Sequence, residues 1–329
     1  MNNDMKKALF SIILLISINA FSQTSELKLA SDIWPPFTNV EGEKSFALDL
    51  VKEALARTGV KANFEILELN DVITGIDAGK YDGSAALWLS EDREKKYLFS
   101  ESYLQNQLVL VGQKGSDVSS ISFADFDGKR IGIIEDYAYG IDINSDQVSL
   151  VTGKNDQQNL ERLFSGQIDY MLVDALLIQY LLKYQVNDVS EHLEIGHAPI
   201  LSKSLHFVIS KDIEDADSII SKFNKEIHKM IADGTYNKIL ELNWVRADMD
   251  GDGQMELILD GNAAGIVPPE CAYCINSDQS LVKKSNKPDQ YYVDGKLYSC
   301  WDNVPQEYKT EIIMSTQDPR NTGIKLNFK

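Results

Sequence analysis

Basic residues are scarce in this 329-residue chain. It has 32 lysines and arginines against 50 aspartates and glutamates, which gives a net charge of −18 at pH 7. Nucleic-acid binding needs a basic face that replaces the counterions of the phosphates, so this balance argues against a nucleic-acid partner. The same acidity argues against binding to an anionic membrane surface. A cationic or zwitterionic small ligand is compatible with it.

The sequence also lacks the motifs of several common enzyme classes. It has no Gly-x-Ser-x-Gly, no His-Glu-x-x-His and no P-loop. Four histidines occur without the spacing of metal ligands, namely His192, His197, His206 and His228. We therefore expect a protein that is not an enzyme. A carboxylate in a cleft can still act as an acid or base, which keeps an enzyme as an alternative.

One apolar run stands out, over residues 8–18. It follows two lysines and precedes Ala20-Phe21-Ser22, which is the order of a secretory signal peptide. At about ten residues it is too short to cross roughly 30 Å of hydrocarbon. We predict a signal peptide over residues 1–22 and a soluble mature protein in the periplasm.

From residue 26 to about residue 243, short apolar runs alternate with helical patterns. Strands are expected at 27–30, 62–67, 84–87, 108–111, 130–134, 170–173 and 205–210. Between them, apolar residues recur at helical spacing, as at Ala47, Leu50, Val51, Ala54 and Leu55. This alternation predicts an α/β fold with doubly wound sheets that carry helices on both faces.

Two of the expected strands, 108–115 and 200–210, are placed to cross between two lobes. A cleft between two α/β lobes that are joined by two strands suits hinge closure on a ligand. After residue 243, Asp, Gly, Asn, Pro and Ser become frequent. The expected division is 26–112 with 203–243 for lobe 1, 113–202 for lobe 2, and 244–329 for a small β-rich C-terminal extension.

Six stretches of the main body match a known pattern in order. They are "ASDIWPPF" at 30–37, "FALDLVKEALARTG" at 46–59, "AGKYDGSAALWLSEDREKKYLFSESY" at 78–103, "FDGKRIGIIEDYAYG" at 126–140, "GQIDYMLVDALLIQYLL" at 166–182 and "ADGTYNKILELNW" at 232–244. In them, residues 26–243 resemble the family 3 extracellular solute-binding proteins, the polar amino-acid-binding type of ABC importers. The resemblance implies the type II periplasmic-binding-protein fold, a small polar solute and a separate membrane permease as partner. We expect a monomer.

The resemblance also assigns candidate ligand residues. Arg93 matches the arginine that pairs with the ligand carboxylate, Asp174 the acid that takes the ammonium, and Trp34 the aromatic that flanks the ligand, with Phe37 as an alternative. A guanidinium forms two parallel charge-assisted hydrogen bonds with a carboxylate, so the chemistry fits. From the residues alone, Arg93 is equally a surface partner of nearby acids, and Asp174 is equally an ordinary helix cap.

Further candidates surround these positions. Asp32 can reach a ligand amine, and Tyr137 and Tyr139 precede an expected helix N-terminus, which favours a carboxylate. Trp88 departs from the family pattern, because amino-acid binders usually have a small or hydroxylated residue there. Ser90 can still donate a hydrogen bond. The departure leaves a different carboxylate, or an aromatic or cationic solute, open beside a plain α-amino acid.

The C-terminal extension contains an Asp-rich loop at residues 248–260. Its candidate metal ligands are Asp248, Asp250, Asp252, Gln254, Glu256 and Asp260. Oxygens at alternate positions and a glycine at the sixth suit Ca²⁺, although Leu259 stands where an EF-hand has its final glutamate. We expect structural Ca²⁺, with a solvated acidic turn as the alternative.

The three cysteines all lie after residue 270. In an oxidising compartment they favour a structural disulfide between Cys300 and either Cys271 or Cys274. A redox or metal-binding Cys-x-x-Cys is the alternative.

The leading interpretation is a periplasmic solute-binding protein. It would capture a small polar, amino-acid-like or carboxylate solute for ABC-type uptake. Two alternatives stay open: a periplasmic enzyme on the same fold, of the cyclohexadienyl dehydratase kind, and a sensory module that reports a ligand to a membrane receptor.

Overall fold

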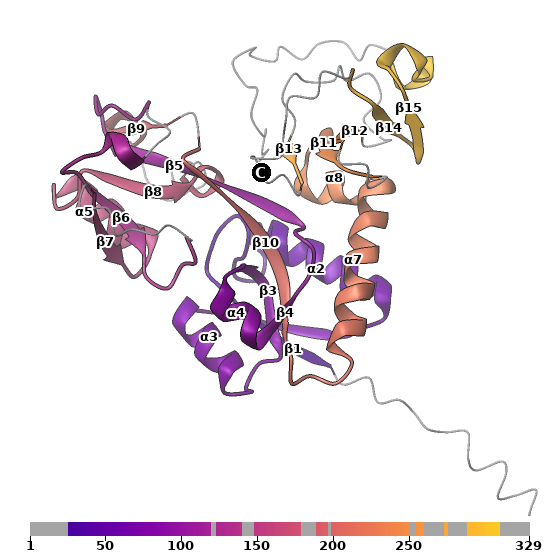
Figure 1. The fold of residues 1–329 in the computed structure, drawn as a ribbon, viewed down its shortest axis with the longest axis horizontal. Helices are drawn as coiled ribbons and strands as arrows, with labels where there is room; N and C mark the ends of the chain where they lie inside the picture. The colour runs from indigo at the N-terminus through magenta and orange to yellow at the C-terminus, as the bar shows by residue number, and fades with distance from the viewer. Residues whose placement is uncertain are drawn as a thin grey trace, which may run out of the picture.

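The computed structural model describes residues 26–119, 123–139, 148–178, 189–196, 199–249, 254–259, 273–275 and 288–309. In these ranges the chain forms two α/β lobes and a separate C-terminal sheet (Figure 1). A ten-stranded sheet runs through both lobes in the order β2-β1-β3-β10-β5-β8-β6-β7, with β4 beside β10 and β9 beside β5.

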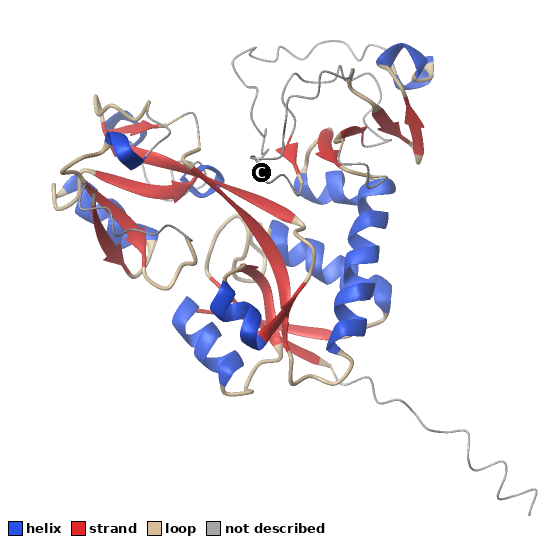
Figure 2. Ribbon diagram, viewed as in Figure 1, coloured by secondary structure: helices blue, strands red, loops and turns tan. Residues whose placement is uncertain are grey.

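Lobe 1 contains β1 (Leu27–Asp32), α2 (Phe46–Thr58), β2 (Ala62–Leu67), α3 (Leu69–Asp77), β3 (Gly83–Trp88), α4 (Glu91–Lys96), β4 (Tyr97–Phe99), α7 (Ala216–Ala232) and α8 (Thr235–Leu240). Its helices lie on both sides of the sheet (Figure 2). Alternate strand residues explain this: Leu29 packs into the core shared with α2 and α7, while Ala30 packs with α3. Helix α2 ends at Gly59, whose φ of 79° is the left-handed conformation that glycine adopts readily at a helix C-terminus.

Two long strands, β5 (Leu104–Gln113) and β10 (Leu201–Ser210), connect the lobes (Figure 1). They pair with each other from Leu104–Leu205 to Leu108–Leu201. Beyond that segment β10 pairs with β3 in lobe 1, and β5 pairs with β8 in lobe 2. The predicted lobe boundaries at residues 112 and 203 fall inside these two strands. Each of the two strands therefore contributes residues to both lobes.

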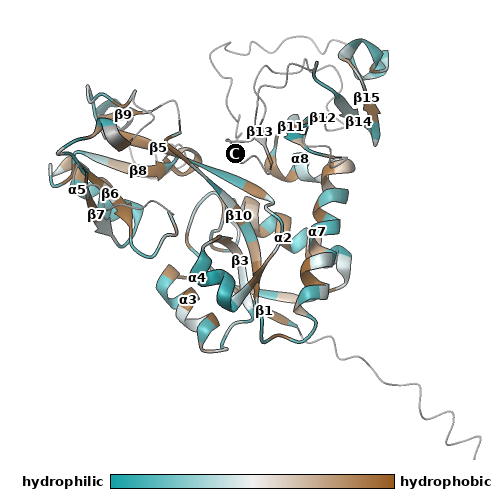
Figure 3. Cartoon of the chain, viewed as in Figure 1, coloured by the Kyte–Doolittle hydropathy of each residue, from teal (hydrophilic) through white to brown (hydrophobic). Residues whose placement is uncertain are grey.

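Lobe 2 contains β6 (Arg130–Ile134), β7 (Ser149–Gly153), α5 (Asp156–Phe164), β8 (Tyr170–Asp174) and β9 (Leu193–Ile195). Strand β6 lies parallel to both β7 and β8. The expected cap of α5 is present, because the Asn155 side chain accepts a hydrogen bond from the Gln158 amide at 2.9 Å. Apolar colour gathers in the central strands, whereas α4 is polar along its length (Figure 3).

The C-terminal sheet has the order β13-β11-β12-β14-β15. Its strands are β11 (Trp244–Ala247), β12 (Glu256–Leu259), β13 (Tyr273–Cys274), β14 (Tyr291–Val293) and β15 (Lys296–Tyr298). Val245, Ala247 and Ile258 belong to the same buried core as α7. The Asn237 side chain of α8 donates to the Ile258 carbonyl at 3.2 Å. The extension is therefore packed onto lobe 1 rather than tethered to it.

The predicted two-lobed α/β fold with a two-strand connection and a β-rich appendage is confirmed. Within the part of the chain that the structure describes, no helix is long and apolar enough to cross a membrane. The predicted signal peptide and residues Asp250, Asp252, Asp260 and Cys271 lie outside the described ranges.

Candidate ligand-binding site

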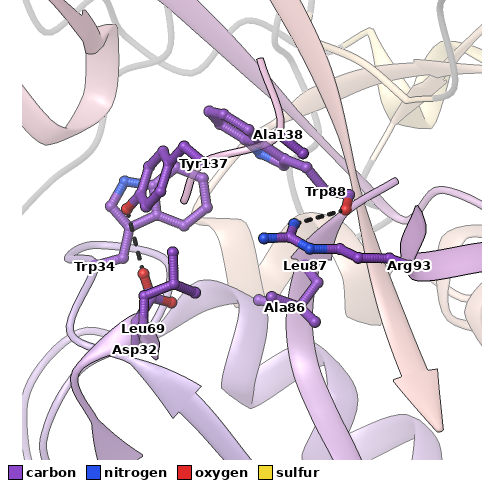
Figure 4. Close-up of a pocket in the computed structure, with 9 residues that line it drawn as sticks. All are labelled: Asp32, Trp34, Leu69, Ala86, Leu87, Trp88, Arg93, Tyr137 and Ala138. Atoms are coloured by element: carbon purple, nitrogen blue, oxygen red, sulfur yellow. Dashed lines mark hydrogen bonds between the residues drawn. The ribbon is translucent and has the colours of Figure 1, made fainter. Parts of the chain in front are cut away.

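A cavity with about 240 Å³ of unfilled space lies between the two lobes (Figure 4). It is lined by Asp32, Trp34, Leu69, Ala86, Leu87, Trp88 and Arg93 from lobe 1, and by Tyr137 and Ala138 from lobe 2. Its wall is mostly apolar and aromatic with a few charged groups, as is usual for small-ligand sites. Closing the lobes therefore brings together residues that lie more than 100 positions apart in the sequence.

Trp34 and Asp32 are held at the carboxyl end of β1 by a tight loop. The Trp34 amide donates to the Thr38 carbonyl at 2.8 Å, and the Thr38 hydroxyl donates to the Asp32 carbonyl at 2.6 Å. Phe37 packs behind Trp34 with ring centroids 4.8 Å apart, and it does not line the cavity. The loop therefore presents the Trp34 ring rather than the Phe37 ring.

Arg93 reaches across the cleft from α4. Its Nη1 donates to the Trp88 carbonyl at 3.0 Å, and its Nη2 donates to the Asp136 carbonyl of lobe 2 at 2.9 Å. Asp136 has a φ of 63°, a left-handed conformation that aspartate tolerates better than most residues. Among the described residues Arg93 forms no ion pair; the neighbouring Asp92 pairs with Lys95 instead. Within the described part of the chain, the guanidinium therefore meets only these two carbonyl oxygens at hydrogen-bonding distance. It faces the cavity without a negatively charged partner among the described residues.

Tyr137 closes the opposite wall. Its hydroxyl donates to Asp32 Oδ2 across the lobes at 3.2 Å (Figure 4). Its ring meets Trp34 and Trp88 edge-on, with centroid distances of 5.7 Å and 5.0 Å. Trp34 and Trp88 also meet edge-on at 5.4 Å. Three aromatic rings therefore form a contiguous wall whose faces and edges are available to a ligand.

Trp88 is fixed from behind. Its Nε1 donates to Asn106 Oδ1 at 2.8 Å, and the Asn106 amide nitrogen donates to Asp174 Oδ2 at 3.2 Å. Tyr139 packs on the Trp88 ring at 5.5 Å, and its hydroxyl accepts from the Ile134 amide at 3.0 Å. Trp88 therefore has one well-supported position and narrows the cavity, as expected from its size.

Asp174 lies behind this wall. Its Oδ1 accepts from the amides of Leu176 and Leu177, at 2.7 Å and 3.3 Å, and its Oδ2 accepts from the Gln107 amide at 3.1 Å. The bonds from Leu176 and Leu177 are those of a helix cap, whereas the Gln107 amide donates from the neighbouring strand β5. Asp174 is 2% exposed. It can therefore affect a ligand only through Asn106 and Trp88, or after the lobes rearrange.

Three carboxyl groups around the cleft have raised pKa values. Burial raises the pKa of Asp32 to about 6, against opposing contributions from its hydrogen bonds and from Arg93. Burial likewise raises the pKa of Asp174 to about 6. Withdrawal from water, with the nearby charges of Asp174 and Asp32, raises the pKa of Asp156 to about 7. Burial lowers the pKa of Arg93.

The cavity wall includes five of the eight predicted ligand residues, namely Asp32, Trp34, Trp88, Arg93 and Tyr137. Asp174 and Tyr139 support the wall from behind. Ser90 caps α4, where its hydroxyl oxygen accepts from the Arg93 amide at 3.4 Å. The ligand role of all eight stays a prediction.

Sequence reasoning missed Asp136, Asp156 and Asn106. Asp156 follows a capping asparagine and reads as an ordinary first-turn acid, which favours the helix dipole. Asn106 lies inside a long strand, and Asp136 acts through its backbone. None of these positions carries a local signal, apart from the acidic pair Glu135-Asp136 after a buried strand.

The predicted calcium loop is described only at its ends. Asp248, Gln254 and Glu256 lie within the described ranges, and the Met249 amide donates to Glu256 Oε2 at 2.8 Å. Across the described residues, no cluster of three His, Cys, Asp or Glu side chains is arranged to hold a metal. Among the described residues Cys300 is half-exposed and forms no disulfide. The side chains of Cys271 and Cys274 are outside this description, so the disulfide stays a prediction.

Two α/β lobes, two connecting strands and a cavity between the lobes define a hinged ligand-binding protein of the type II class. Residues 27–246 match the family described as bacterial extracellular solute-binding proteins, family 3. The chain therefore belongs to that family.

Relatives and solved structures agree with this assignment. The L-cystine-binding protein TcyA of Bacillus subtilis (strain 168) is 23% identical over 281 residues, which cover 74% of this chain and 99% of that protein. A probable amino-acid ABC transporter-binding protein of Haemophilus influenzae (strain ATCC 51907 / DSM 11121 / KW20 / Rd) is 25% identical over 263 residues, with coverage of 74% and 99%. The structure of an ancestral arginine-binding protein bound to arginine superposes with a TM-score of 0.56 at 24% identity, and covers 66% of this chain and 96% of that one.

Proposed function

We propose that this chain captures an amino acid in the periplasm and delivers it to the permease of an ABC importer. The observation that carries the proposal is Arg93, whose guanidinium faces the inter-lobe cavity without an ion-pair partner among the described residues. A ligand carboxylate can replace the Trp88 and Asp136 carbonyls as its acceptor. The relatives named as amino-acid-binding proteins support the same solute class.

The test is a thermal-shift screen of residues 23–329 against the common amino acids, L-cystine, L-ornithine, L-citrulline, polyamines and small carboxylates. A ligand at 100 times its dissociation constant stabilises the folded state by about 2.7 kcal/mol. We expect at least one amino acid to give such a shift, and its affinity is then measured by calorimetry. A screen in which no amino acid binds contradicts the proposal.

Arg93 provides the residue-level check. Arg93→Ala should weaken amino-acid binding by about 100-fold, since it removes a charge-assisted pair in a site withdrawn from water. Lys95→Ala is the matched control, because it removes one positive charge from the same short helix at a side chain that is 71% exposed. Equal affinities for the two variants would place the ligand carboxylate elsewhere.

We propose no enzymatic activity for the cleft. Asp32 and Asp156 have pKa values suited to proton transfer, but both relatives described above are named as binding proteins. Incubation with prephenate should leave it unchanged beyond its spontaneous decay. A faster conversion that is lost in Asp156→Asn would favour the dehydratase alternative.

The cellular setting is part of the same proposal. Cleavage near Gln23 after a signal peptide would release a monomer into the periplasm. Mass spectrometry of the exported protein checks the cleavage site, and size-exclusion chromatography with light scattering checks the monomer. A retained leader or a stable dimer would contradict these two points separately.

We also propose a structural Ca²⁺ in the loop at 248–260. The loop ends are held together because Ala247 pairs with Glu256 between antiparallel strands β11 and β12. Three aspartates so close in sequence repel one another without a cation between them. Calcium should raise the melting temperature relative to EGTA, Asp250→Asn should abolish that rise, and amino-acid affinity should not change. A melting temperature that is indifferent to calcium would leave a solvated acidic turn.

A further inference from the structure

We infer that the cleft selects a basic amino acid, one whose side chain carries a positive charge in addition to the α-ammonium. The inference rests on the proposed amino-acid-binding function and names the solute class within it. It depends on the balance of charged groups around the cavity and on the composition of its wall. Neither observation depends on what the relatives bind.

The described part of the cavity lining holds one acid and one base, and the excess of acids comes from residues around it. Arg93 is the one basic side chain among the described residues that line it, and Asp32 is on the same wall. Asp156 and Asp174 are close enough for their charges to interact with each other, and Asp156 also interacts with Asp32. Glu68, which precedes α3, adds to the negative potential at Asp32. With its acids ionised, the cleft is therefore net negative.

A zwitterion leaves this balance unchanged. Its carboxylate offsets Arg93, and its ammonium offsets one acid, so at least one buried carboxyl group remains without a cation. Buried carboxylates in that position repel one another or hold a proton, and both cost binding free energy. A second ligand cation reduces the mismatch, whereas a second ligand carboxylate increases it. Charge balance therefore ranks basic solutes above neutral ones, and acidic solutes last.

The wall suits a cation as well. Trp34, Trp88 and Tyr137 contact one another edge-on around the cavity, which leaves ring faces for an ammonium or guanidinium to lie over. Trp88 lines this wall as well. Its indole N–H points away from the ligand, to Asn106. The wall thus offers π faces in place of hydrogen-bond donors.

The experiment compares solutes of matched shape by calorimetry at pH 8. L-Arginine is paired with neutral L-citrulline, and L-lysine with neutral L-norleucine, while L-glutamate and L-cystine complete the set. We expect the better of the two basic amino acids to bind about 100-fold more tightly than its neutral counterpart, because the extra charge meets ionised acids in a site withdrawn from water. L-Glutamate should bind most weakly.

Asp156→Asn tests the source of the selectivity. It should reduce the basic-to-neutral affinity ratio at least tenfold, because basic solutes lose an attractive charge and neutral solutes no longer leave this acid without a cation. Asp217→Asn makes the same charge change at an exposed position on α7 and should leave the ratio unaltered. Circular dichroism confirms that both variants fold.

The outcomes separate the two proposals. Tighter binding of L-cystine or another neutral or acidic amino acid overturns the basic-solute inference and leaves the amino-acid-binding function standing. A ratio that Asp156→Asn does not change also overturns the inference as argued here. No binding of any amino acid overturns both.

Discussion

At the scale of single residues, the carboxyl groups of the cleft link stability to pH. Asp156 has a folded-state pKa of about 7 against an ordinary value of 3.8. The folded state therefore binds more protons than the unfolded chain between these two values. The contribution of Asp156 to stability is fully present below about pH 4 and is lost as the pH rises through about 7. Asp32 and Asp174 act in the same direction, up to about pH 6.

This linkage makes a prediction for Asp156→Asn, which cannot ionise. Between pH 5 and pH 8 the ligand-free wild type should lose roughly 1–2 kcal/mol more unfolding free energy than the variant, after allowance for solvent screening of a half-buried group. Urea denaturation at the two pH values measures the difference. Parallel pH dependences in the two proteins would mean that Asp156 titrates as an ordinary surface acid.

The sequence singled out residues of the cavity wall where they belong to a recognisable motif, and their ligand role stays a prediction. Arg93, Trp34 and Trp88 lie in stretches that resemble the family, and the structure places all three on the cavity wall. Asp156 was out of reach because its interaction with Asp174 depends on packing within lobe 2, and its interaction with Asp32 depends on how the two lobes meet. Asp136 was missed because its carbonyl, rather than its side chain, meets Arg93.

At the scale of elements, the C-terminal sheet behaves as part of lobe 1. One face carries Val245 and Ile258 in the core shared with α7, and the other carries a separate cluster around Trp244. The sequence predicted a small β-rich extension here from its turn residues, but not its packing onto lobe 1. The sequence could not reveal this packing. A half-buried strand has the same alternating pattern whether its apolar face packs within its own domain or against another one.

This packing predicts that core substitutions in β12 will destabilise the whole binding domain. Ile258→Ala should cost about 2–4 kcal/mol, since the side chain is 1% exposed and its removal leaves a cavity. Leu297→Ala, at a residue that is 45% exposed in β15, should stay within about 0.5 kcal/mol. Guanidinium denaturation followed by fluorescence should show one transition that shifts in Ile258→Ala. Two transitions, with only one shifted, would mean that the extension unfolds independently.

At the scale of the whole molecule, the two lobes are held in the closed arrangement partly by the chain itself. The contacts between Tyr137 and Asp32 and between Arg93 and Asp136 cross the cleft. The lobes are connected through the paired segment of β5 and β10 from Leu104–Leu205 to Leu108–Leu201, which is where a hinge would lie. A ligand carboxylate that binds Arg93 would replace the bond from Arg93 to the Asp136 carbonyl. The hydrogen bond from the Tyr137 hydroxyl to Asp32 would then be the cross-lobe contact that remains in the bound state.

Tyr137→Phe therefore should shift the ligand-free protein toward an open arrangement. Loss of a hydrogen bond worth about 1 kcal/mol changes the closed-to-open ratio about fivefold. Small-angle scattering should give a larger radius of gyration for the ligand-free variant than for the wild type, and saturating amino acid should bring the two values together. Tyr139→Phe is the matched control, because its hydroxyl bonds to Ile134 within lobe 2. If Tyr137→Phe and Tyr139→Phe have the same radius of gyration without ligand, the hinge strands rather than the cross-lobe bond set the resting arrangement.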